Sequence, residues 1–129
     1  MAAKITFPIA RRYDTQFLAS GEVQVRGFDL DYIDTGSLPA PLFWDMAVKV
    51  SYDIGEQAFS HYLIAKDQGK PLTALPVFPS RFFPQLGLTV NQQSGIRSPL
   101  DLVGKRVGVP GFGYNPAAWM RGILAHQSV

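Results

Sequence analysis

The sequence predicts an α/β fold with a mainly parallel sheet. Segments rich in β-branched residues alternate along the chain with segments in which apolar residues recur at helical spacing, and this alternation is typical of layered α/β folds. Hydrophobic residues make up 47% of the 129 positions and charged residues 17%, so the chain can bury a core and is not of the disordered type. At this length we expect one domain, or one lobe of a larger fold.

Two strands and a short helix are expected at the start of the chain. Residues 4–10 are apolar and β-branched, with Pro8 near the exit of the predicted strand. Residues 12–19 can make two helical turns that end at Gly21. Residues 28–33 alternate apolar with acidic side chains, which is the pattern of a half-exposed strand.

A second group of elements follows. Apolar residues recur at helical spacing over 41–50, and Asp45 and Lys49 are paired four apart on the other face of that predicted helix. Residues 52–55 are expected to form a short buried strand. The serine that opens residues 60–69 can cap the next helix.

The rest of the chain contains two clear helix starts. Ser98 can cap a helix in which Pro99 takes the first position and Asp101 the third, and Asn115 with Pro116 repeats the cap-plus-proline pattern. Gly104 ends the first of these helices. The remaining strands are expected at residues 72–78, 86–90 and 105–109.

Charge and composition exclude several classes of protein. Twelve Lys and Arg against ten Asp and Glu give a net charge of only +2, and the basic residues are spread out, so no nucleic-acid partner is expected. Without cysteine there is no thiolate nucleophile and no cysteine-ligated metal, and His61 and His126 are too few to indicate a metal centre. No apolar run approaches a membrane span and the start does not have the order of a secretory signal, so we expect a cytoplasmic protein.

Three loops follow predicted strands, at the edge where α/β sheets bind ligands. In the first, residues 56–62, backbone amides and Ser60 can hold an anion, and His61 can act as an acid or base. An ordinary capped helix and a surface histidine are the alternatives. In the second, residues 79–82, Arg81 can clamp a carboxylate or can be a solvated surface arginine.

The third loop, residues 108–116, contains glycines that let the backbone approach a ligand before a helix begins. A carboxylate or phosphate would suit it, and a plain strand-to-helix turn is the alternative. The loop lacks the third glycine of a dinucleotide fingerprint and the Gly-Lys-Ser/Thr of a phosphate loop.

Four segments of the chain resemble the 4,5-dihydroxyphthalate decarboxylase family, which is similar in fold to the type 2 periplasmic solute-binding proteins. They are residues 75–81, 94–102, 104–110 and 117–124. The Phe-Pro-Ser-Arg and Trp-x-Arg-Gly-Ile-Leu motifs are more particular to the decarboxylases, whereas Gly-Lys-Arg-Val-Gly-Val-Pro is shared with many solute-binding relatives.

The resemblance implies a two-lobed α/β clamp that holds a small anionic aromatic or organic acid. Residues 1–93 would form most of the first lobe, and residues 94–129 the crossover and the opening strand and helix of the second. Family members are more than twice this long, so the type 2 architecture would be incomplete here. An uncovered sheet edge would then invite self-association.

The resemblance also implies site residues. Glu56, Ser60 and Tyr62 match a loop of the family, and Ser80 with Arg81 match its strand-end pair. Tyr114 and Asn115 are expected substrate contacts because of their place in the third loop, and not from the resemblance, since residues 112–116 depart from the family's pattern. The chain departs from the family in having apolar residues after Arg81, where the family carries a basic and histidine-containing stretch, and Gly111 in place of an acidic residue.

The implied reaction is non-oxidative decarboxylation of a hydroxylated aromatic acid, without a metal or an organic cofactor. Arg81 would hold the retained carboxylate, Glu56 or His61 would supply a proton to the ring, and Tyr62 or Ser60 would bind the phenol. The fragment alone is expected to be inactive. The competing interpretations are a non-catalytic substrate-binding protein of the ABC-transporter type for a small organic acid, and an orphan lobe that neither binds nor turns over anything.

Overall fold

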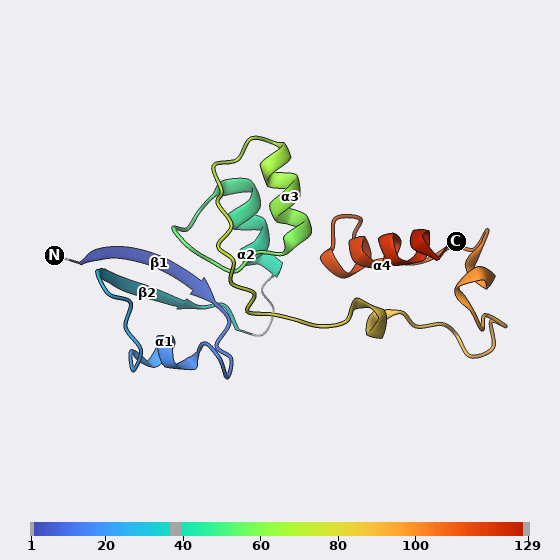
Figure 1. Cartoon of the computed structure of the whole chain (residues 1–129), viewed down its shortest axis with the longest axis horizontal. Helices are drawn as coiled ribbons and strands as arrows, with labels where there is room; N and C mark the ends of the chain where they lie inside the picture. The colour runs from blue at the N-terminus through green and yellow to red at the C-terminus, as the bar shows by residue number, and fades with distance from the viewer. Residues whose placement is uncertain (1, 37–39, 128–129) are drawn as a thin grey trace. The chain divides into compact units, whose positions relative to one another are not determined.

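The computed structural model describes residues 2–36 and 40–127, and its chain divides into two compact units, Met1–Pro79 and Ser80–Val129 (Figure 1). We describe each unit by itself. The division at residue 93 expected for the lobes of a longer protein stays a prediction, and residues 128 and 129 of the expected second-lobe segment lie outside the described residues.

The first unit is built on a two-stranded parallel sheet. Strand β1 (Ala3–Ile9) pairs with β2 (Phe28–Asp34) in a register that runs from Ala3 opposite Phe28 to Ile9 opposite Asp34. Both strands and their parallel pairing confirm the sequence-based prediction. On one face Phe7 meets the edge of Tyr32, with ring centroids 6.5 Å apart.

Helix α1 (Gln16–Ser20) lies in the crossover between the strands. It ends as predicted at Gly21, whose left-handed φ of 78° lets its N–H bond to the carbonyl of Leu18. It begins four residues later than expected, because residues 12–15 form a separate hydrogen-bonded turn.

A helical segment and a second helix, which contact each other, follow the sheet in the first unit. Helix α2 (Ala40–Trp44) continues into the π-helical η1 (Asp45–Lys49), and the predicted pair of Asp45 and Lys49 has an O–N distance of 2.7 Å. Helix α3 (Phe59–Asp67) begins one residue before Ser60, with Ala58 at its N-cap, so the predicted Ser60 cap is wrong. The buried side chains of this unit are mainly small or aliphatic: Pro8, Ile9, Ala10, Leu42, Met46, Ala47, Ala58 and Ala65.

The expected strand at residues 52–55 is not a strand, although the segment does run along β1. The carboxylate of Asp53 accepts hydrogen bonds from the N–H and hydroxyl of Thr6, at 2.8 and 2.7 Å, and Ile54 N–H donates to the Thr6 carbonyl. A side chain therefore takes the place that a strand backbone would have. Gly55 continues this path so closely that a Cβ there would lie 3.4 Å from the carbonyl oxygen of Pro8.

The second unit contains the 3-10 turns η2 (Pro84–Gly87) and η3 (Pro99–Leu102) and helix α4 (Asn115–His126), which contacts η2. The predicted start at Ser98 is confirmed, because Ser98 and Asp101 form a reciprocal capping box. The predicted last helix is also confirmed, with Pro116 in its first turn. Its N-cap is Tyr114 instead of Asn115.

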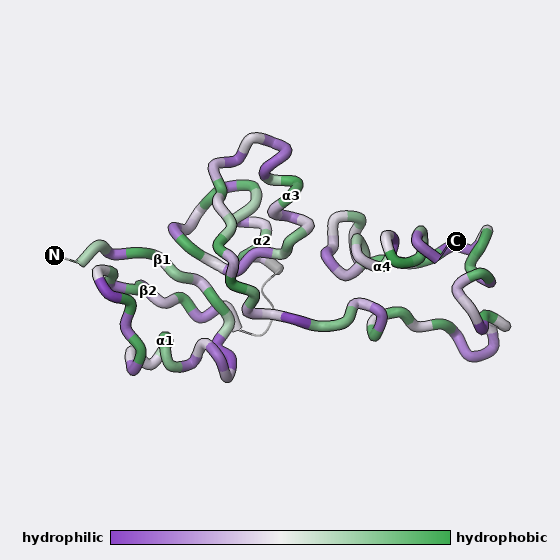
Figure 2. The backbone as a smooth tube through the Cα atoms, in the orientation of Figure 1, coloured by the Kyte–Doolittle hydropathy of each residue, from purple (hydrophilic) through white to green (hydrophobic). Residues whose placement is uncertain are grey.

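The strands expected at 72–78, 86–90 and 105–109 are not formed, because no neighbouring strand is present among the described residues of these parts to complete a ladder. Hydrophobic residues are spread along this non-helical backbone (Figure 2), and Val77, Phe78, Leu86 and Val109 are exposed. The chain is an α/β structure with a small, open parallel sheet, as predicted.

Candidate functional site

The carboxyl end of β1 is fixed by a buried threonine. The Thr15 hydroxyl, in a residue that is only 5% exposed, donates to the carbonyl of Ala10 at 2.7 Å and accepts from the N–H of Arg12 at 2.9 Å. The carbonyl of Arg12 accepts in turn from the N–H of Thr15 and of Gln16. This turn places Arg12 directly beyond the end of the strand.

Arg12 forms an ion pair with Glu56. Its Nη1 lies 2.8 Å from Oε2 of Glu56, whose side chain is 8% exposed, and its Nε lies 3.4 Å from the more exposed Asp14. Burial lowers the pKa of Arg12, but the hydrogen bond and charge of Glu56 outweigh it and the pKa is raised, so the guanidinium is charged. Nη2 of Arg12 is buried and has no hydrogen-bond partner among the residues that the structure describes.

Three further buried polar atoms of this unit have no partner within the described ranges: Tyr32 Oη, Thr35 Oγ1 and His61 Nδ1. Burial raises the pKa of Tyr32, helped by the charge of Asp34, while the charges of Arg11 and Arg12 act in the opposite direction. The charge of the Arg12 guanidinium therefore acts on the Tyr32 hydroxyl. Unpartnered buried polar groups are uncommon in folded proteins, so four in one small unit indicate a place for water or a ligand.

The Arg12–Glu56 pair and Thr35 lie where three segments end. The last pair of the sheet is Ile9 with Asp34, so Ala10 and Thr35 are the next residues along the two strands. The segment beside β1 passes Pro8 at Gly55 and reaches Glu56. Ligands of open α/β sheets bind beyond the carboxyl ends of parallel strands, which is this edge of the sheet.

The structure places the predicted residues of the first loop in this unit. Glu56 lies in the loop before α3, while Ser60, His61 and Tyr62 are half-buried in its first turn. The N–H of Tyr62 donates to the carbonyl of Ala58 and so belongs to the helix start. The structure thus brings Glu56 to Arg12, a residue that the sequence analysis did not choose.

The other predicted site residues belong to the second unit. Ser80 and Arg81 are exposed at its beginning, and Tyr114 and Asn115 stand at the start of α4. The glycine-rich loop before α4 is held by Arg121, which donates to the carbonyl of Phe112 at 2.7 Å and stacks its guanidinium 3.8 Å from the centre of that ring. The binding roles of these four residues stay predictions.

Arg12, Tyr32 and Thr35 are the candidate residues that the sequence analysis missed. Arg12 carried a signal, because a basic residue directly after an apolar strand lies at the ligand-binding edge of a parallel sheet. Tyr32 and Thr35 carried none, since a tyrosine and a threonine in or after a strand are ordinary β-sheet residues.

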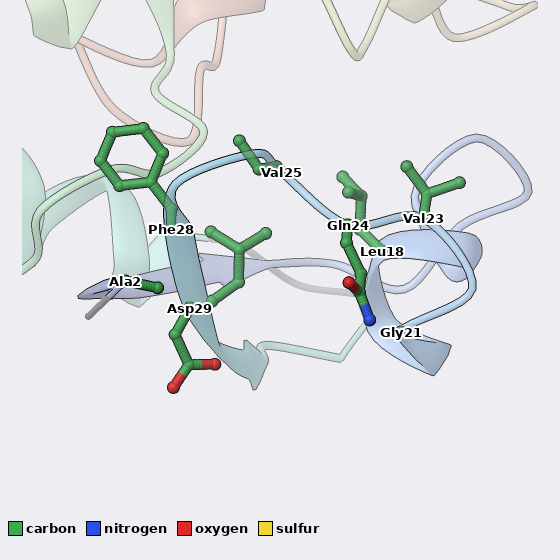
Figure 3. A pocket seen from close by; sticks show the side chains of 9 residues that line it. Ala2, Leu18, Gly21, Val23, Gln24, Val25, Phe28 and Asp29 are labelled. Carbon is green, nitrogen blue, oxygen red and sulfur yellow. The ribbon is translucent and has the colours of Figure 1, made fainter.

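A separate cavity of about 540 Å³ lies near the opposite ends of the strands. Figure 3 shows side chains from β2, α1 and the loop between them around it. Its lining residues are mostly apolar: Ala2, Leu18, Gly21, Val23, Gln24, Val25, Phe28, Asp29 and Leu30. Among the described residues of this lining, only Asp29 carries a charge, and that charge is negative.

Two features of metal and membrane proteins are absent from the described part of the chain. Residues 2–36 and 40–127 contain no group of three or more His, Cys, Asp or Glu side chains arranged to hold a metal ion. Over the same ranges, no helix has both the length and the apolar character needed to cross a bilayer.

The fold is α/β with a small, open parallel sheet, and the family that the chain matches is periplasmic-binding-protein-like. Residues 45–129 match the family described as NMT1/THI5 like, and the chain belongs to that family.

Two curated relatives are 4,5-dihydroxyphthalate decarboxylases, which confirms the resemblance seen in the sequence. The one from Comamonas testosteroni is 36% identical over 111 residues, which cover 85% of this chain and 33% of the relative. The one from Pseudomonas putida is 36% identical over 105 residues, covering 81% of this chain and 40% of the relative. The chain therefore spans between a third and two fifths of the length of these relatives.

Proposed function

We propose that the full-length protein containing this sequence catalyses the non-oxidative decarboxylation of a hydroxylated aromatic acid of the 4,5-dihydroxyphthalate type. The names of the two similar relatives support the reaction. The observation that carries the proposal in this chain is the Arg12–Glu56 pair at the carboxyl ends of the strands, where Nη2 of Arg12 is buried and has no partner among the described residues.

The chemistry needs a proton and a place for electrons. A hydroxyl para to the leaving carboxylate donates electron density to the ring, and the ring carbon that bears the carboxylate accepts a proton. The C–C bond to the carboxylate then breaks, its electron pair returns to the ring, and carbon dioxide leaves. One proton is consumed and no electron is exchanged with another molecule, so a protein acid and fixed charges suffice.

The contacts of Glu56 and His61 support a division of their roles. Glu56 accepts a hydrogen bond from Arg12, which supports a role in holding the guanidinium in place. His61 keeps a buried ring nitrogen without a partner among the described residues, which suits it to carry the proton. In the same proposal Tyr62 or Ser60 binds the phenol, and Arg81, with Ser80, Tyr114 and Asn115, contacts the rest of the acid.

The experiment is an assay of the full-length protein with 4,5-dihydroxyphthalate labelled with ¹³C in its carboxylates. We expect labelled carbon dioxide and 3,4-dihydroxybenzoate in equal amounts. His61→Asn should lower kcat about 100-fold, within the usual range for loss of a general acid, and His126→Asn is the matched control with no change. Absence of labelled carbon dioxide from the folded wild-type protein would contradict the proposal.

The second candidate is a non-catalytic binding protein for a small organic acid. The specific observation in its favour is the match to a periplasmic-binding-protein-like family over residues 45–129. The same assay separates the two, because a binding protein would raise its melting temperature with the acid and release no carbon dioxide.

Two further parts of the proposal concern the chain and the cell. Because the 129 residues cover at most two fifths of the relatives, we propose that they show no turnover when produced alone. We also propose that the full-length protein works in the cytoplasm, which fractionation of its own cells would test.

A further inference from the structure

We infer that Arg12 and Thr35 form a carboxylate-binding subsite at the carboxyl ends of β1 and β2, in which Nη2 of Arg12 and the hydroxyl of Thr35 donate to the ligand. The inference uses the proposed function only for the class of ligand, a small acid, and not for the reaction. It assigns the recognition of one carboxylate to Arg12, in the first unit, whereas the sequence pointed to Arg81.

Arg12 is held in place on both sides. Thr15 fixes its backbone, and Glu56 engages Nη1 at 2.8 Å. What is left is Nη2, which is buried and has no partner within the described part of the chain. A guanidinium restrained in this way loses little conformational entropy when it binds, which is the condition for a tight recognition group.

The buried atoms at this edge that lack partners among the described residues can act as hydrogen-bond donors. A guanidinium N–H can only donate, and the hydroxyls of Thr35 and Tyr32 can each donate one hydrogen bond. An ionised carboxylate is the common organic group that accepts at several positions and donates at none. A catechol would satisfy the hydroxyls but would bring its own O–H donors toward the guanidinium.

The charges at this edge favour the binding of an acid. Glu56 contacts Arg12 at Nη1, and the two other carboxylates named near this edge are largely solvated. Asp14 has a side chain that is 48% exposed, and Asp34, in an exposed residue, accepts from the N–H of Gly36. Solvated carboxylates are screened by water and salt, so they oppose an incoming acid less than the partly buried guanidinium attracts it.

The test measures binding of phthalate, which has two carboxylates and no hydroxyl, and of catechol, which has the reverse, to the full-length protein by titration calorimetry. We expect Arg12→Lys to weaken phthalate binding about 10-fold or more, through loss of the planar donor group. Thr35→Val should weaken it about 3-fold or more, through loss of one hydrogen bond. Catechol binding should change less than about 2-fold in both. The control is Arg11→Lys, an exposed neighbour of the same type, which should leave phthalate binding unchanged.

Phthalate binding that is unchanged in Arg12→Lys, or weakened equally with catechol binding, would overturn the inference, as would a folded wild-type protein that binds no carboxylate. If Arg12→Lys fails to fold by circular dichroism, Thr35→Val decides. Phthalate binding that depends on Arg12, without release of carbon dioxide from dihydroxyphthalate, would refute the proposed reaction and leave this subsite standing. Turnover of dihydroxyphthalate with an unchanged KM in Arg12→Lys would refute this subsite and leave the proposed reaction standing.

Discussion

The side chains of the Arg12–Glu56 pair differ in their solvent exposure. Loss of the charge of one partner therefore affects the free energy of unfolding differently from loss of the other. Glu56 keeps 8% of its side chain exposed and Arg12 29%. Removing the charge of Glu56 leaves a partly buried guanidinium without its closest partner. A partly buried cation that loses its closest counter-ion is costly, although its exposed part can still be solvated by water.

We therefore predict that Glu56→Gln lowers the free energy of unfolding by about 1–3 kcal/mol, below the range for a fully buried pair. The matched control is Asp14→Asn, which removes a more exposed carboxylate from the same arginine and should cost less than about 0.5 kcal/mol. Urea denaturation of both variants measures the difference. Equal losses would show that the short contact to Glu56 has no special role.

The hydrogen bonds between Asp53 and Thr6 make the stability of the fold depend on pH. The N–H of Thr6, and then its hydroxyl, hold the pKa of the Asp53 carboxyl below its ordinary value of 3.8. The unfolded chain binds this proton more readily than the folded chain does. Stability from this contact is therefore complete above pH 3.8 and is lost as the pH falls below that value.

We predict that Asp53→Asn flattens the loss of melting temperature between about pH 4 and pH 2. Thr6→Val, which keeps the backbone donor and removes the hydroxyl, should flatten it only in part. Thermal melts followed by circular dichroism at several pH values test this. The idea fails if the wild-type and Asp53→Asn curves stay parallel through the acid range.

At the scale of the element, the end of η1 is strained. Val50 takes a left-handed φ of 53°, and its N–H bonds back to the carbonyl of Asp45. A β-branched residue rarely adopts this conformation, which costs an L-residue roughly 1–2 kcal/mol relative to glycine.

We predict that Val50→Gly raises the free energy of unfolding by about 0.5–1 kcal/mol, after the entropy that glycine loses on folding is subtracted. Val48→Gly, inside η1, is the control and should lower it by about 1 kcal/mol. Chemical denaturation compares the two. A loss in Val50→Gly as large as that in Val48→Gly would show that the left-handed residue is not strained.

Elements set by local chemistry were predicted well from the sequence, and elements that need a distant partner were not. The capping box of Ser98 and Asp101 and the stop at Gly21 lie within a few residues of their partners. The strands expected at 86–90 and 105–109 instead depend on neighbours to complete a ladder. The site follows the same division, because the sequence indicated Glu56 but not the arginine 44 residues away that it contacts.

At the scale of the whole molecule, one apolar segment has little cover. Six large hydrophobic residues between positions 75 and 86 are at least 56% exposed: Leu75, Val77, Phe78, Phe82, Phe83 and Leu86. Contiguous apolar surface of this kind favours association. The self-association expected from the sequence is therefore a prediction about this segment as well as about the sheet edge.

We predict that the 129-residue chain produced alone self-associates with rising concentration, and that Phe83→Ser with Leu86→Ser reduces this. Tyr13→Ser, at an aromatic residue that is 87% exposed but lies outside the segment, is the control. Sedimentation velocity at several concentrations measures the effect. A chain that stays monomeric at every concentration, or double and control variants that behave alike, would rule out the segment as the cause.

The parallel pairing of β1 with β2 also sets an order of events during synthesis. Every paired position in this sheet joins residues 25 apart, as in Ala3 with Phe28, and the Thr6–Asp53 contact spans 47. At about 5–20 residues per second, a ribosome needs roughly 1–5 s to add the partner of a given β1 residue. Throughout that interval the first strand exists only as an unpaired apolar segment, open to capture by a chaperone or by a neighbouring nascent chain.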